Sequence, residues 1–179
     1  MKNVKPGHAQ PVICLDAGHF GAYNQSPVVP EYYESTMNWK LQNFLKAELE
    51  NYGIKVFTTR NDPDADLPLT SRGEASEGCD LFISLHANYA EDPGADYVLG
   101  IHMVQNGSRI AMESMLLADL LGKAAGKVMG ASDVRLWTRA GGNDRNGDGF
   151  PDDYYGVLRG AARVGTAGVI LEHGCFSNE

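Results

Sequence analysis

Leu81-Phe82-Ile83-Ser84-Leu85-His86-Ala87-Asn88 is the stretch that decides the fold of this 179-residue chain. Residues 81–85 form a short, mostly apolar run, as expected of a strand that is buried on both faces of a sheet. The run leads directly into His86, whose imidazole is a common metal ligand. A buried strand that ends in such a residue is typical of α/β sheets, in which ligands bind at the carboxyl ends of the strands.

Two other predicted strands end in the same way. Residues 12–15 run into Asp16 and His19, and residues 167–171 run into Glu172. Because loops converge where parallel strands end, we expect these polar side chains to lie close together. Further strands are predicted over residues 54–58, 97–104 and 134–137, and helices over residues 35–52, 70–78, 109–129 and 154–164.

The alternation of strands and helices predicts an α/β fold with a twisted, mostly parallel sheet and helices on both faces. We expect one domain over residues 1–179, with a polar tail over residues 1–11. The predicted helix 35–52 is expected to turn one apolar face to the sheet and to end at Gly53. That face comprises Met37, Leu41, Phe44, Leu45, Leu49 and Tyr52.

Composition excludes several classes of protein. Hydrophobic residues make up 43% of the chain, which is enough for a core, and the formal net charge of −8 argues against a nucleic-acid partner. Cys14, Cys79 and Cys175 are too few for a disulfide framework, so we expect three small buried side chains. No apolar run is long enough for a membrane span. We expect a monomer.

The tail lacks the apolar region of a signal peptide. Three interpretations follow: a protein that stays in the cytoplasm until it is released, a chain whose signal has been removed, or one domain of a larger exported protein.

The five histidines of the chain do not have equal claims as metal ligands. His8 lies in the polar tail and His102 lies inside a predicted strand, whereas His19, His86 and His173 each follow a strand. A catalytic zinc takes about three protein ligands and leaves one position open. Two histidines at converging strand ends therefore make a metal site plausible.

Two carboxylates compete to complete that set. Glu34 shares a helix face with Asn38, one turn later, while Glu31 lies just before the helix, and spacing alone leaves both open. Glu172 follows a buried strand, so burial should raise its pKa towards the range that suits proton transfer. The competing interpretation of Glu172 is a structural ion pair with Arg60 or Arg72.

These segments together resemble the zinc-dependent N-acetylmuramoyl-L-alanine amidases of the Amidase_3 type. The resemblance runs in order over nearly the whole chain. The matching stretches are residues 15–21, Glu34 with Asn38, residues 53–60 with Asp62, Arg72, residues 80–88, residues 154–159 and residues 171–178.

The resemblance implies that His19, Glu34 and His86 bind one Zn²⁺ and that Glu172 is the catalytic carboxylate. It places the family position on Glu34 because Asn38 keeps the Glu-to-Asn spacing. Enzymes of this family cleave the amide between N-acetylmuramic acid and the L-alanine of the stem peptide. The implied partner is peptidoglycan, at the bacterial cell wall, reached by secretion or by release from the cytoplasm in the case of a phage lysin.

The sequence departs from the family pattern at two points. Phe20 stands where glycine is frequent, and we expect it to narrow the cleft. The chain stops at Glu179, soon after the last motif, so we expect a truncated or disordered end.

Residues 144–153 begin like a calcium-binding loop, with oxygen donors at alternate positions and Gly149 in the sixth. Tyr155 stands where the bidentate glutamate belongs, which favours a plain acidic loop over a Ca²⁺ site. Two other functions stay open: a zinc peptidase that cuts within the stem peptide, and a non-catalytic wall-binding module on the same scaffold.

Overall fold

The computed structural model of the chain describes residues 10–177. The predicted tail lies outside the described residues apart from Gln10 and Pro11, as do His8 and the chain end, residues 178 and 179. The elements follow in the order β1 (Val12–Ala17), α1 (Glu34–Asn51), β2 (Lys55–Thr58), α2 (Leu69–Glu74), β3 (Leu81–Asn88), β4 (Tyr97–His102), α3 (Arg109–Met129), β5 (Asp133–Trp137), α4 (Gly156–Arg163) and β6 (Ala167–Cys175).

All of these strands belong to one sheet with the order β2-β1-β3-β6-β4-β5. Its pairs are parallel except that β4 runs antiparallel to β6. The carboxyl ends of β1, β3 and β6 therefore meet at one edge, while β4 ends at the opposite edge. The predicted mostly parallel α/β sheet is confirmed.

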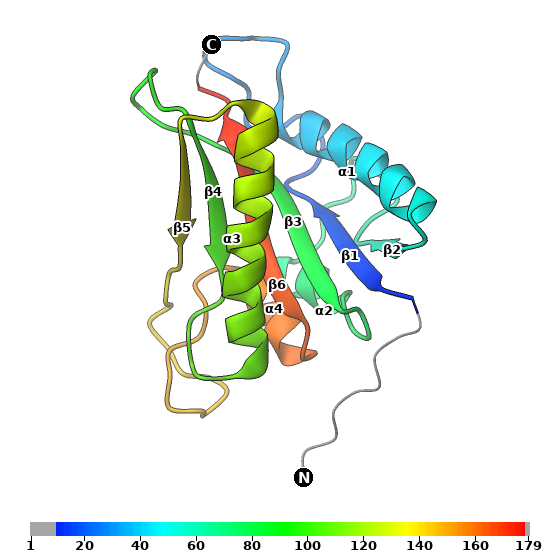
Figure 1. The fold of residues 1–179 in the computed structure, drawn as a ribbon, viewed down its shortest axis with the longest axis vertical. Coiled ribbons are helices and arrows are strands. Elements are labelled where there is room, and N and C mark those ends of the chain that lie inside the picture. The colour runs from blue at the N-terminus through cyan, green and yellow to red at the C-terminus, as the bar shows by residue number, and fades with distance from the viewer. Residues whose placement is uncertain (1–9, 178–179) are drawn as a thin grey trace.

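Helices cover both faces of the sheet, as predicted (Figure 1). Helices α1 and α3 lie over one face, where Leu15, Leu85 and Val169 form part of a buried cluster. Helices α2 and α4 lie behind the sheet in the same view, on the side of the cluster that contains Phe82 and Leu158. Because the central strands are buried on both faces, they are apolar along most of their length.

Helices α2 and α4 cross with their backbones in contact. A Cβ on Gly73 would collide with the backbone of Val157, and a Cβ on Gly160 would collide with the backbone of Thr70. The two glycines are thus reciprocal, since each makes room for the other helix. This contact holds α2, and with it Arg72, firmly beneath the sheet.

The buried side of α1 differs from the predicted one. Leu41, Leu45 and Leu49 pack against the core, but Phe44 and Tyr52 are 74% and 81% exposed. The prediction of one continuous apolar face was therefore wrong. The fully buried positions are polar because the start of the helix faces the end of the sheet; they are Glu34, Ser35, Asn38 and Gln42.

The cysteines are free, and the prediction of burial holds for Cys14 and Cys79, whereas Cys175 is partly exposed. No helix in residues 10–177 is long and apolar enough to cross a membrane.

Candidate metal site

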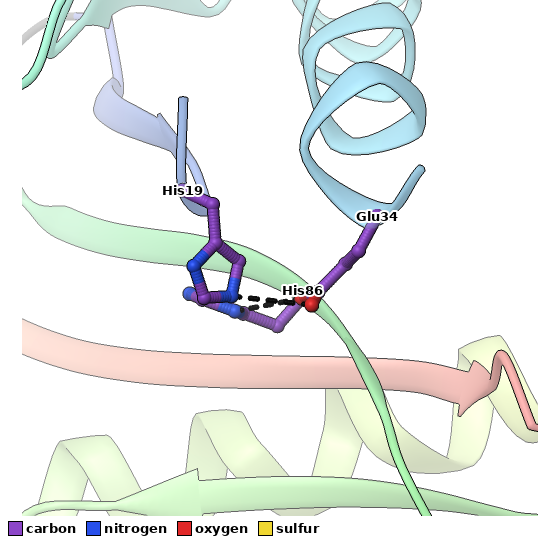
Figure 2. Close-up of side chains that lie close together, drawn as sticks. All are labelled: His19, Glu34 and His86. Atoms are coloured by element: carbon purple, nitrogen blue, oxygen red, sulfur yellow. Dashed lines mark hydrogen bonds and ion pairs between the residues drawn. The ribbon is translucent and has the colours of Figure 1, made fainter. Parts of the chain in front are cut away.

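The structure brings together His19, Glu34 and His86. Their ligand atoms all lie within 4.8 Å of one another. The Glu34 carboxylate faces both rings, with Oε2 3.1 Å from His19 Nε2 and Oε1 2.9 Å from His86 Nδ1 (Figure 2). Glu34 is 1% exposed, whereas the competing Glu31 is exposed. Of the two carboxylates left open by the sequence, Glu34 is the one at the site.

The turn that carries His19 has a constrained backbone. His19 itself adopts φ of +59°, a left-handed conformation that is uncommon for a residue other than glycine. Gly18 is required for a different reason: a Cβ there would lie 2.5 Å from the ring of His86. The two histidines can approach each other only because the residue between β1 and His19 has no side chain.

Hydrogen bonds hold this turn from several elements. Gln42 on α1 accepts a bond from the N–H of Ala17 at 2.9 Å, and the carbonyl of Leu85 accepts one from Gly18, also at 2.9 Å. Arg60 donates to the carbonyl of His19 at 2.8 Å. The backbone that carries His19 is thus held by contacts within the protein.

The Asp16 side chain holds the end of β1 in place through hydrogen bonds. Its carboxylate is fully buried and accepts hydrogen bonds from Arg72 at 2.8 and 3.0 Å, from Ser84 at 2.6 Å and from Thr59 at 2.6 Å. Because Arg72 pairs with Asp16 and Arg60 bonds to backbone carbonyls, neither is the partner proposed for a structural Glu172.

The surroundings of Glu34 keep it ionised. Oε1 accepts a bond from the N–H of Ala87 at 3.0 Å, and Oε2 accepts one from Asn24 at 2.7 Å. Burial alone would raise the pKa of the Glu34 carboxyl, but hydrogen bonds from His19 and His86 outweigh it and hold that pKa well below its usual value. The same carboxylate raises the pKa of His86 against the opposing effect of burial.

Glu172 lies beside this cluster in a contrasting environment. It is the register partner of His86 on the neighbouring strand, so the two side chains point to the same face of the sheet. Its Oε2 is buried and has no hydrogen-bond partner. Burial raises the pKa of Glu172, while the nearby His86 opposes that shift.

The remaining histidine candidates lie elsewhere. His173 follows Glu172 on β6 and therefore points to the other face, where it lines a groove with Met37, Phe44 and Met129. His102 is buried, with Nδ1 2.8 Å from the carbonyl oxygen of Met103. Neither belongs to the group around Glu34.

Nearly the whole chain matches a known protein family. The sequence model of the N-acetylmuramoyl-L-alanine amidase family Amidase_3 matches residues 13–179. The chain belongs to this family. No curated protein matches the chain in sequence.

Solved structures of amidases share this fold. The catalytic domain of the amidase CwlV from Bacillus (Paenibacillus) polymyxa var. colistinus has a TM-score of 0.68 and 22% identity, over 94% of this chain and 83% of that one. An amidase from Clostridium difficile 630 has a TM-score of 0.73 and 18% identity, over 94% and 82%. The amidase Ami1 from Mycobacterium smegmatis has a TM-score of 0.71 and 16% identity, over 94% and 83%.

The side chains at the site fit the zinc ion associated with the Amidase_3 family. Two imidazoles and one carboxylate are a donor set that zinc uses in catalytic sites. Glu34 is a buried anion whose charge a cation would compensate. Of the His, Cys, Asp and Glu side chains in residues 10–177, these three form the group whose geometry suits a metal.

In the acidic loop of residues 144–153, carboxylates bond to backbone N–H groups of the loop itself. The carboxylate of Asp144 accepts bonds from the N–H groups of Gly147 and Gly149 at 2.8 and 3.0 Å, and Asp148 accepts one from Phe150 at 2.9 Å. These carboxylates stabilise the turns of their own loop.

Phe20, which departs from the family pattern, lies beside Tyr23 with 6.4 Å between ring centroids and is 36% exposed.

Sequence reasoning missed Asn24, which contacts Glu34 and His19, and Gln42, which bonds to the turn that carries His19. Gln42 is one turn of helix beyond Asn38 on the same side of α1, so the spacing of Glu34 and Asn38 could have pointed to it. Asn24 lies in the loop before α1, where no motif or spacing marks it.

Proposed function

We propose that the chain is a zinc-dependent hydrolase that cleaves the amide between N-acetylmuramic acid and the L-alanine of the peptidoglycan stem peptide. One observation carries this proposal: Glu172, with a buried and unpartnered carboxylate oxygen, stands beside a compact His19–Glu34–His86 group. The family membership supports the amide bond as the target.

The two glutamates of the site are suited to different roles. Glu34 is kept ionised by the two imidazoles, as a metal ligand must be. Glu172 has its pKa raised by burial, which suits a group that gains and loses a proton near neutral pH. Environments that push two carboxyl pKa values apart commonly separate the roles of such a pair.

His19, Glu34 and His86 would hold the zinc, which when bound lowers the pKa of a coordinated water and polarises the amide carbonyl. Glu172 takes a proton from the attacking water at its unpartnered oxygen. It then passes that proton to the leaving nitrogen of L-alanine, so the peptide departs as a neutral amine. Arg60 and Gln42 keep the His19 turn in place throughout.

The setting of this reaction belongs to the proposal as well. We propose that residues 1–179 form one catalytic domain that acts as a monomer at the bacterial cell wall, with peptidoglycan rather than nucleic acid as its partner. The acidic loop of residues 144–153 has no part in the metal chemistry, because its carboxylates bond to their own backbone.

Digestion of purified peptidoglycan followed by mass spectrometry tests this function. We expect intact glycan strands and released peptides with free L-alanine amino groups, together with about one zinc per chain. Chelation should stop release, and added zinc should restore it. Cleavage within the stem peptide would instead identify a peptidase, and wall binding without any new amino group would identify a binding module.

A further inference from the structure

Asn24 reaches the same atoms that form the candidate metal site. Its side-chain Nδ2 lies 2.7 Å from Oε2 of Glu34 and 3.2 Å from Nε2 of His19. Both of these atoms belong to the group that suits a metal. The hydrogen bond that Nδ2 donates occupies a lone pair on Oε2 of Glu34 that a cation would need.

The backbone of Asn24 keeps it at this place. Its carbonyl accepts a hydrogen bond from the N–H of Glu34 at 2.9 Å, and its φ of +54° is a left-handed conformation that asparagine tolerates. Ser35, the next residue of α1, accepts a bond from the N–H of Tyr23 at 2.8 Å. The first turn of α1 therefore holds both a ligand and the loop that covers it.

The ring of Tyr23 adds a further restraint, because it stacks on His19 with 4.8 Å between centroids and 17° between planes. With the loop anchored at residues 23 and 24, the side chain of Asn24 can change its hydrogen bonding chiefly by rotation. Rotation about the terminal amide torsion is easy, since that torsion is broad and roughly two-fold.

An NH₂ group is a donor only, so it cannot face a cation. A half-turn of the amide exchanges Nδ2 for Oδ1, an oxygen that accepts hydrogen bonds and binds metals. We propose that Asn24 is a fourth protein residue of the metal site, whose Oδ1 turns to the zinc when the ion is bound. This inference rests on the proposed function. Catalytic zinc sites can expand from four ligands to five, so a fourth protein donor leaves room for water.

Two substitutions at this position separate the amide from the loop conformation. Asn24→Gly removes the amide and tolerates the left-handed backbone, while Asn24→Asp keeps the shape and offers oxygen at both terminal atoms. Gln25→Ala is the matched control, because Gln25 bonds to the carbonyl of Pro30 in the same loop and not to the three candidate ligands.

The measurement is the Zn²⁺ dissociation constant of the full chain by competition with a chromophoric chelator, with the visible absorption of bound Co²⁺ as a second readout. We expect Asn24→Gly to weaken Zn²⁺ binding about 10- to 100-fold, as loss of supporting groups commonly does, and to change the Co²⁺ spectrum. Asn24→Asp should tighten binding, and Gln25→Ala should match the unaltered protein.

Unchanged or tighter Zn²⁺ binding in Asn24→Gly, with an unaltered Co²⁺ spectrum, would overturn the inference, since it would mean that the amide only competes with the ion. If that result came with zinc-dependent wall hydrolysis in the unaltered protein, the proposed function would stand alone. If the unaltered protein bound no Zn²⁺, both proposals would fail together. Opposite effects of Gly and Asp cannot arise from general unfolding.

Discussion

The candidate metal site and the loop of residues 144–153 both gather several polar side chains, but they use them differently. At the metal site the side chains come from separate elements, β3, α1 and the turn after β1, and their ligand atoms converge. In the loop, Asp144 and Asp148 are exposed and bond to nearby backbone N–H groups. The number of acidic residues is therefore a weak indicator of a metal site. Buried side chains whose ligand atoms lie close together are a stronger one.

The largest effect that would test this difference is expected from His86→Ala. The substitution removes one of three proposed ligands and should lower bound zinc far below one per chain, with wall hydrolysis falling to the level of the metal-free protein. Metal analysis and wall digestion on the same sample are the measurements. His102→Ala serves as the control, because His102 bonds to a backbone carbonyl far from the site. Stoichiometric zinc in His86→Ala would mean that another side chain is the ligand.

Glu172→Gln should have the next largest effect. Glutamine keeps the shape of the side chain but cannot accept the proton, so the hydrolysis rate should fall on the order of 100- to 10,000-fold. Zinc content should stay near that of the unaltered protein, because His19, Glu34 and His86 remain. Loss of zinc together with activity would identify Glu172 as a ligand. Activity within a few-fold of the unaltered protein would show that another group is the base.

A smaller effect is expected at the border of the acidic loop, from Asp153. Burial raises the pKa of this carboxyl to about 6, even though the N–H of Val104 donates to it at 2.7 Å. Since the folded-state pKa lies above the unfolded value, protonated Asp153 favours folding below pH 4, and this contribution is lost as the pH rises to about 6.

The difference in unfolding free energy between the unaltered protein and Asp153→Asn, measured by urea denaturation from pH 4 to pH 7, isolates this contribution. It should shift by about 2 kcal/mol against the unaltered protein over that interval. Asparagine keeps an acceptor for Val104 and does not ionise. A difference that stays flat across the interval would show that Asp153 ionises normally.

The smallest effect is expected from calcium. Because the loop carboxylates already stabilise their own turns and the twelfth position is Tyr155, millimolar Ca²⁺ should leave the melting temperature of the zinc-loaded protein unchanged. Asp148→Ala should respond to Ca²⁺ in the same way as the unaltered protein. A clear rise in melting temperature that Asp148→Ala abolishes would show that the loop binds Ca²⁺.

The sequence was sufficient where local patterns determine structure. Apolar runs marked β1, β3 and β6, and the polar residues that follow those runs meet at one sheet edge. The direction of β4 could not be predicted in this way, because the residue pattern of a strand does not indicate whether it runs parallel or antiparallel to its neighbour. The prediction of an apolar face on α1 was wrong because the buried side of the helix carries Gln42 and Glu34. These residues face the end of the sheet, where backbone groups need hydrogen-bond partners.

The contacts of Asn24 could not be predicted from the sequence for a related reason. Its contacts with Glu34 and His19 depend on how the loop folds back over α1, and neither its residue type nor its spacing indicates that path. The role assigned to Glu172 in catalysis likewise stays a prediction. The structure adds that its supposed structural partners, Arg60 and Arg72, are engaged elsewhere.

The hydrogen bonds that hold the His19 turn bear on whether folding of the chain would depend on a metal. Gln42, Leu85 and Arg60 fix this turn by contacts within the protein alone. Small zinc domains commonly fold only around their ion, so that metal supply and folding are one event. The backbone of the His19 turn is instead held by hydrogen bonds within the protein, so we expect the chain to fold whether or not zinc is present.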